Sequence, residues 1–154
     1  MLIKTLQTLF ERDLNKLKHE IDSYQDERKL WHIEKGIANS AGNLCLHLIG
    51  NLNTYIGAEI GKSGYIRNRE KEFSLKNIPK SALIHEIDKT KEIVINALEK
   101  LTEKDLEKEY PILVFDKKTS FAYFLTHLTT HLAYHVGQIN YHRRLLDQQE
   151  YEII

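Results

Sequence analysis

The sequence has few of the residues that interrupt, cross-link or bias a chain. Its 154 residues include one cysteine, two prolines and seven glycines, and its 22 basic side chains balance 22 acidic ones. The lone cysteine, Cys45, excludes an internal disulfide and suits a reducing compartment. Nucleic-acid binding usually requires a basic excess, which this chain does not have. We therefore predict a cytoplasmic protein without a nucleic-acid partner.

Long apolar runs are also missing. No stretch approaches the roughly 20 residues that a membrane-spanning helix needs. The first residues, MLIKTLQTLFERDL, carry charges at amphipathic spacing instead of the apolar block of a signal peptide. We therefore predict no membrane association. The length suits one domain with one core, residues 1–154.

Four long segments repeat apolar residues with a helical period. Both prolines, Pro79 and Pro111, lie where that pattern breaks. Thr102 and Asp105 have the spacing of a capping box, which predicts a short extra helix between the third and fourth segments. Together these features predict an all-α fold, a four-helix bundle with short connections. The segments run from about Leu2 to Tyr24, from Ile37 to Ile60, from a predicted N-cap at Ser81 to Leu101, and from Ser120 to Leu146.

Histidine is the residue in excess, with eight in the chain. Three of them, His127, His131 and His135, are spaced by four on the fourth segment and border its apolar face. Two imidazoles at i and i+4 can converge on one metal ion, and a third ligand must then come from another helix. His47, on the apolar edge of the second segment, is the candidate. The spacing does not decide which histidines of the fourth segment are ligands, and a packed core histidine is the alternative for each.

Other polar residues are candidates for supporting roles. Asn43 and Asn51 lie one turn before and after His47, where an amide could bind the free N–H of the ligand or contact a substrate. Arg67 and Arg69, in the connection 61–80, are candidates for an anion contact, with solvated surface charge as the alternative. No catalytic residue can be selected. Glu-x-x-His pairs, HExxH and the common glycine-rich phosphate loops do not occur in the sequence.

Two blocks of the sequence resemble the DinB superfamily, in its branch of uncharacterised DinB-like proteins. They are NSAGNLCLHLIGNLNTYIGAEI with the following YIRNREKEF, and THLTTHLAYHVGQINYHRRLL. The resemblance covers nearly the whole chain and implies an up-down-down-up four-helix bundle with a metal site. By position it implies that His47, His131 and His135 are the ligands and that His127 is a neighbour. Gln138 matches the family's glutamine.

The superfamily includes transferases that use low-molecular-weight thiols such as bacillithiol or mycothiol. The resemblance therefore implies one divalent metal ion (Zn, Ni or Fe), a thiol as a second cofactor, a small-molecule substrate and a homodimer. The chain departs from many members at Val136, where they have arginine, which removes any anion contact from that position. Two alternatives stay open: a non-catalytic bundle that is metal-stabilised or dimerising, and a metal-dependent hydrolase.

Overall fold

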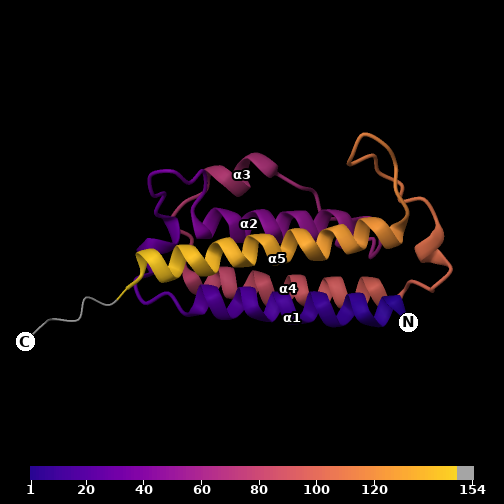
Figure 1. Ribbon diagram of the computed structural model, residues 1–154, viewed down its shortest axis with the longest axis horizontal. Helices are drawn as coiled ribbons and strands as arrows, with labels where there is room; N and C mark the ends of the chain where they lie inside the picture. The colour runs from indigo at the N-terminus through magenta and orange to yellow at the C-terminus, as the bar shows by residue number, and fades with distance from the viewer. Residues whose placement is uncertain (149–154) are drawn as a thin grey trace, which may run out of the picture.

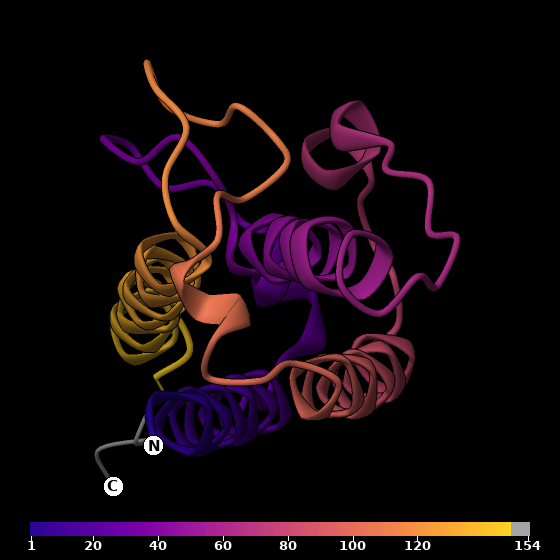
Figure 2. The same ribbon diagram turned by 90° about the vertical axis from the view of Figure 1, so that its right-hand side faces the viewer.

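The computed structural model describes residues 1–148, and this part of the chain is all-α, without β-strands. The main helices α1 and α5 run in one direction and α2 and α4 in the other, which gives the up-down-down-up order (Figure 1). Figure 2 shows these four helices end-on around a shared core, with α1 in contact with both α4 and α5. The main helices are α1 (Leu2–Asp22), α2 (Ala41–Leu52), α4 (Lys80–Glu99) and α5 (Phe121–Leu146). The short elements are η1 (Glu27–Trp31), the π-helical turn η2 (Asn53–Ala58) that continues α2, α3 (Arg69–Ser74) and η3 (Asp105–Glu107).

The start of α2 is set by a capping serine. The Ser40 hydroxyl accepts a hydrogen bond from the backbone N–H of Asn43 at 3.2 Å and donates to the Asn43 side-chain oxygen at 2.7 Å. A cap of this kind satisfies a backbone donor that the first helical turn leaves unpaired. The helix therefore begins at Ala41 and not at Ile37, where its apolar pattern begins.

The other main helices agree with the sequence to different degrees. α5 begins after Ser120, as predicted, and that serine accepts from the N–H of Tyr123 at 3.1 Å. The prediction of an N-cap at Ser81 is wrong. Pro79 occupies the N-cap position of α4, whose first helical residue is Lys80.

The connection between α4 and α5 and the connection between α2 and α4 differ more from the prediction than the main helices do. Thr102 and Asp105 do bond each other reciprocally, with the Asp105 carboxylate accepting from the Thr102 N–H at 2.8 Å. The extra helix that follows is a single 3₁₀ turn, η3. The sequence did not predict α3, which contacts α2 on the outside of the bundle (Figures 1 and 2).

The core fixes the rotation of α5. Leu128, Leu132 and Ile139 are buried, whereas the histidines at 131 and 135 lie at the edge of this buried stripe. Because residues three and four apart share a helical face, the two rings emerge together beside α2. None of the helices in residues 1–148 combines the length and apolar character that crossing a membrane requires.

Candidate metal centre

Three imidazoles from two helices meet between α2 and α5. His47 lies on α2, and His131 and His135 lie one turn apart on α5. The Nε2 atom of His131 is 3.2 Å from the Nε2 atoms of both other rings, and one ligand atom from each histidine lies within 4.8 Å of the others. Nitrogen atoms held about 2.0–2.1 Å from a tetrahedral zinc ion are roughly 3.3 Å apart. The group therefore has the size of a three-nitrogen metal site and could hold an ion.

Hydrogen bonds on the far sides of two rings fix their protons. The Nδ1 atom of His47 lies 3.1 Å from a carboxylate oxygen of Glu72, and Nδ1 of His135 lies 2.7 Å from the amide oxygen of Gln138. Both oxygens only accept, so they favour a proton on Nδ1 of each neutral ring; at His47 the terminal nitrogen of Arg67, 3.4 Å from Nδ1, is the longer contact. The lone pairs on Nε2 of His47 and His135 consequently face His131. Acceptors placed in this way orient histidine ligands in metal sites.

Within the described chain, the third ring is not oriented by a hydrogen bond on its far side. Nδ1 of His131 is buried and has no hydrogen-bond partner among the described residues. A proton on its Nε2 atom could bond to only one of the two lone pairs that face it. A cation at the centre would interact favourably with all three Nε2 atoms at once. The donor set therefore fits a metal ion better than it fits internal hydrogen bonding.

Glu72, which supports His47, is itself held by an arginine. Arg67 contacts both Glu72 oxygens, through Nε and a terminal nitrogen, each at 2.8 Å. Both side chains are largely buried, at 16% exposed for Arg67 and 6% for Glu72. A bidentate, desolvated pair of this kind is stronger and more rigid than a surface ion pair. The chain Arg67–Glu72–His47 thus fixes one ligand from outside the bundle.

The local electrostatics favour neutral imidazoles. Burial, together with the neighbouring His135 and His47, lowers the pKa of His131 to about 4. Burial also lowers the pKa of His135, which the hydrogen bond to Gln138 partly opposes. For Glu72, burial raises the pKa, but the hydrogen bonds from Arg67 and His47 outweigh it and the pKa is lowered. At neutral pH His131 and His135 therefore have free lone pairs, as metal binding requires.

Comparison with known families identifies the family of the chain but no activity. A family model described as a protein of unknown function, DUF1572, matches residues 2–154. The chain belongs to this family. No match was found among curated proteins. Since DUF1572 membership assigns no reaction, the function of this member has to be argued from its site.

The two asparagines of α2 do not contact the ligand rings. The Asn43 side-chain nitrogen donates to the backbone oxygens of Glu72 and Leu75, each at 2.9 Å. Asn43 therefore holds α3 against α2 and acts on His47 only through Glu72. Asn51 is buried, and its side-chain oxygen has no hydrogen-bond partner among residues 1–148.

The other candidate residues of the sequence differ in whether they contact the group of three histidines. His127 packs edge-on against Phe115 with ring centroids 4.7 Å apart, and its ring lies 6.2 Å from that of His131, outside the three-ligand group. Arg67 binds the carboxylate of Glu72, whereas the Arg69 guanidinium lies 5.7 Å from the centre of the Phe73 ring. Gln138 orients His135, as described above.

Glu72 is the functional residue that the sequence did not reveal. It lies in the charged run RNREKEF, within the connection 61–80. One signal was present: Asn68 precedes a turn with Glu70 and Glu72, and an asparagine before acidic residues is a typical helix start. The Asn68 side chain does cap α3, accepting from the Lys71 N–H at 3.2 Å.

We expect Gly50→Ala to weaken metal binding by displacing Glu72. A methyl group at this position of α2 would overlap the Glu72 carboxylate, which Arg67 prevents from moving aside. Loss of an outer acceptor typically reduces metal affinity about 10–100-fold. Competition with a chelator measures the affinity. Gly137→Ala on α5 is the matched control, because its added methyl group meets no atom within 4 Å. Equal affinities in the two variants would contradict the prediction.

We also expect the metal-free protein to lose stability on acidification between pH 6.5 and about 4. The pKa of an unperturbed histidine is about 6.5, whereas folded His131 takes a proton only near pH 4. The unfolded state therefore binds more protons in this window, and stability falls as the pH is lowered through it. Urea unfolding at pH 7, 6 and 5 tests this expectation. His131→Gln should show a shallower pH dependence, and identical slopes would refute the assignment.

Proposed function

We propose that this DUF1572 protein is a DinB-like metalloprotein that activates a low-molecular-weight thiol for transfer to an electrophile. One divalent ion would be held by His47, His131 and His135. The observation that carries the proposal is the convergence of three Nε2 atoms, two of them oriented by Glu72 and Gln138. Zinc, nickel and iron all suit imidazole ligands.

Thiol transfer suits a site with three protein ligands and no protein nucleophile. The three histidines would hold the ion and leave room for a further ligand, and a bound divalent metal would supply the lowering of a thiol's pKa. The only cysteine cannot be the nucleophile, because Cys45 is fully buried and burial raises its pKa to about 12. The sulfur must therefore come from a small molecule. It would bond to the electrophilic carbon, the thiol proton would pass to solvent, and the leaving group would depart with its electron pair.

The two alternatives have less support from the site. A metal hydrolase needs a general base near the metal-bound water. Among the described residues, Glu72 is the only carboxylate hydrogen-bonded to any of the three histidines; it bonds to His47, and its oxygens are engaged by Arg67 and His47. A non-catalytic, metal-stabilised bundle would need no open position. A homodimer and a small-molecule substrate belong to the same proposal.

The deciding experiment combines metal content with a thiol assay on the untagged protein. Elemental analysis should find about one ion per chain, as purified or after loading with Zn, Ni or Fe. The loaded protein, but not the chelated one, should then accelerate the displacement of chloride from monochlorobimane by bacillithiol, mycothiol or cysteine. Hydrolysis of 4-nitrophenyl acetate without thiol would favour the hydrolase. Bound metal with both assays blank would favour the non-catalytic bundle.

A further inference from the structure

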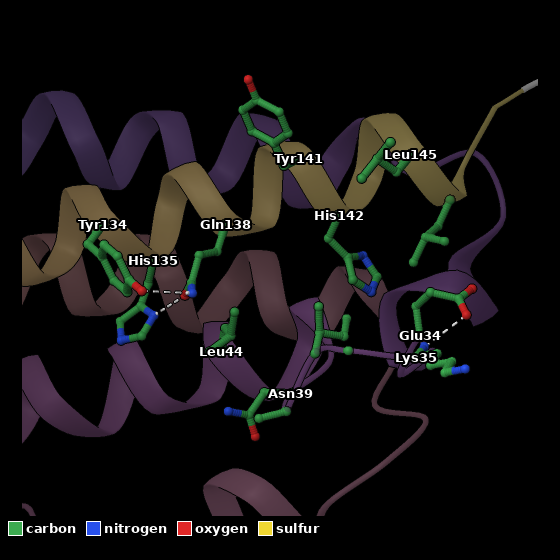
Figure 3. A pocket seen from close by; sticks show the side chains of 14 residues that line it. Glu34, Lys35, Asn39, Leu44, Tyr134, His135, Gln138, Tyr141, His142 and Leu145 are labelled. Carbon is green, nitrogen blue, oxygen red and sulfur yellow. Dashed lines mark hydrogen bonds between the residues drawn. The ribbon is translucent and has the colours of Figure 1, made fainter.

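A large pocket lies next to the group of three histidines, and His135 belongs to both. It has a volume of about 770 Å³ and lies between α5 and the segment that precedes α2 (Figure 3). Pockets for small molecules usually measure about 300–1,000 Å³. Along α5 its lining extends from Tyr134, next to His135 of the candidate metal site, to Leu146, twelve residue steps and so about 18 Å. The space is thus long enough for an extended molecule whose end lies at His135.

The pocket wall is mainly apolar, although the polar side chains of Lys35, Asn39 and Tyr141 also line it. Ile37, Leu44 and Leu145 contribute aliphatic side chains to its wall. His142 also lines it, but this ring is engaged on both sides. Its Nδ1 atom lies 2.6 Å from the hydroxyl of Tyr24, and its Nε2 donates to the backbone oxygen of His32 at 2.8 Å. A sugar-based thiol with many hydroxyl groups would place part of them against this aliphatic wall, where they would lose hydrogen bonds to water.

One residue connects the pocket with the metal site. Gln138 lines the pocket, and its amide oxygen binds Nδ1 of His135 while its nitrogen donates to the Tyr134 hydroxyl at 3.3 Å. Figure 3 shows these three side chains together at one end of the pocket. A molecule that fills the pocket therefore meets the Nδ1 side of the His135 ring, and its end must pass this ring to reach the three Nε2 atoms.

From these observations we infer that the pocket binds an elongated, mainly apolar molecule whose reactive end lies at His135. This inference rests on the proposed function, because it identifies the electrophile as the apolar substrate and leaves the polar thiol to the open side of the metal. The pocket itself does not depend on a bound ion, so binding to it can be tested separately.

The first test uses N-phenyl-1-naphthylamine, a neutral fluorophore that brightens in apolar surroundings, with the metal-free full chain. We expect saturable binding that Ile37→Ser weakens about fivefold or more, through loss of buried apolar contact. Ala38→Trp, which fills the space from the pocket wall, should abolish it. Ile33→Ser is the matched control, because Ile33 is 47% exposed against 44% for Ile37 but does not line the pocket. No binding, or equal binding to Ile33→Ser and Ile37→Ser, would overturn the inference.

The second test asks whether the pocket leads to the metal. Alkyl hydroxamates, which chelate the ion, are titrated into cobalt-loaded protein while its visible absorption is recorded. From acetohydroxamate to octanohydroxamate, affinity should rise up to about fourfold per methylene buried in the pocket, and Ala38→Trp should remove the increase. Equal affinity along the series would refute the link to His135. Failure to load cobalt would count against the proposed function alone, since fluorophore binding would still decide whether the pocket takes apolar molecules.

Discussion

Replacing His131 with alanine is expected to reduce bound metal from about one ion per chain to almost none. His131 is the central residue of the candidate site, because its Nε2 atom is the one that lies 3.2 Å from the Nε2 atoms of both His47 and His135. Without it, two nitrogens on different helices remain, and the i, i+4 pair that α5 offers is broken. The loss of affinity should exceed the roughly 10–100-fold that removal of an outer acceptor causes. Elemental analysis and chelator competition measure both quantities.

His127→Ala is the matched control for this prediction. His127 lies one turn earlier on α5, but it packs against Phe115 and is outside the three-ligand group. Added zinc should raise the melting temperature of the wild type and of His127→Ala, since a ligand at 100 times its Kd stabilises the folded state by about 2.7 kcal/mol. His131→Ala should not respond. Undiminished metal in His131→Ala would make the histidines an ordinary feature of helix packing.

The fold could be predicted from the sequence because helices form from a local, periodic pattern of apolar residues. Each main helix repeats apolar residues over many turns, so its existence does not depend on any single side chain. Boundaries were less certain, because they depend on which polar residue caps the first turn. At α2 the apolar pattern begins at Ile37, but the Ser40 cap decides the start.

The support of the candidate site could be predicted only in part. Gln138 lies on the same helix as His135, so the contact follows from helical spacing. Glu72 reaches His47 from α3, a helix of six residues that is too short to show a period. The position of α3 depends on tertiary contacts, including those that Asn43 makes to its backbone. Helical spacing puts Asn43 one turn from His47, but its side chain points to α3 instead.

Arg67→Ala is expected to destabilise the protein by roughly 3–5 kcal/mol, the usual effect of leaving a buried charge without its partner. Glu72 would keep only the hydrogen bond from His47. Release of α3 into solvent would limit the loss, because the carboxylate could then be hydrated. Arg69→Ala is the control, since this exposed arginine makes no ion pair in the described chain and should change stability by no more than about 0.5 kcal/mol. Urea unfolding measures both variants, and a loss below about 1 kcal/mol for Arg67→Ala would class the pair with ordinary surface ion pairs.

The double variant Arg67→Met/Glu72→Leu separates stabilisation from positioning. Replacing a buried ion pair with apolar residues of similar volume is often neutral or stabilising, so most of the lost stability should return. Metal affinity should stay about 10–100-fold below that of the wild type, because no acceptor would then hold Nδ1 of His47. Recovery of both properties would mean that Glu72 only stabilises the attachment of α3. Recovery of stability alone would show that the pair acts on the metal through the orientation of His47.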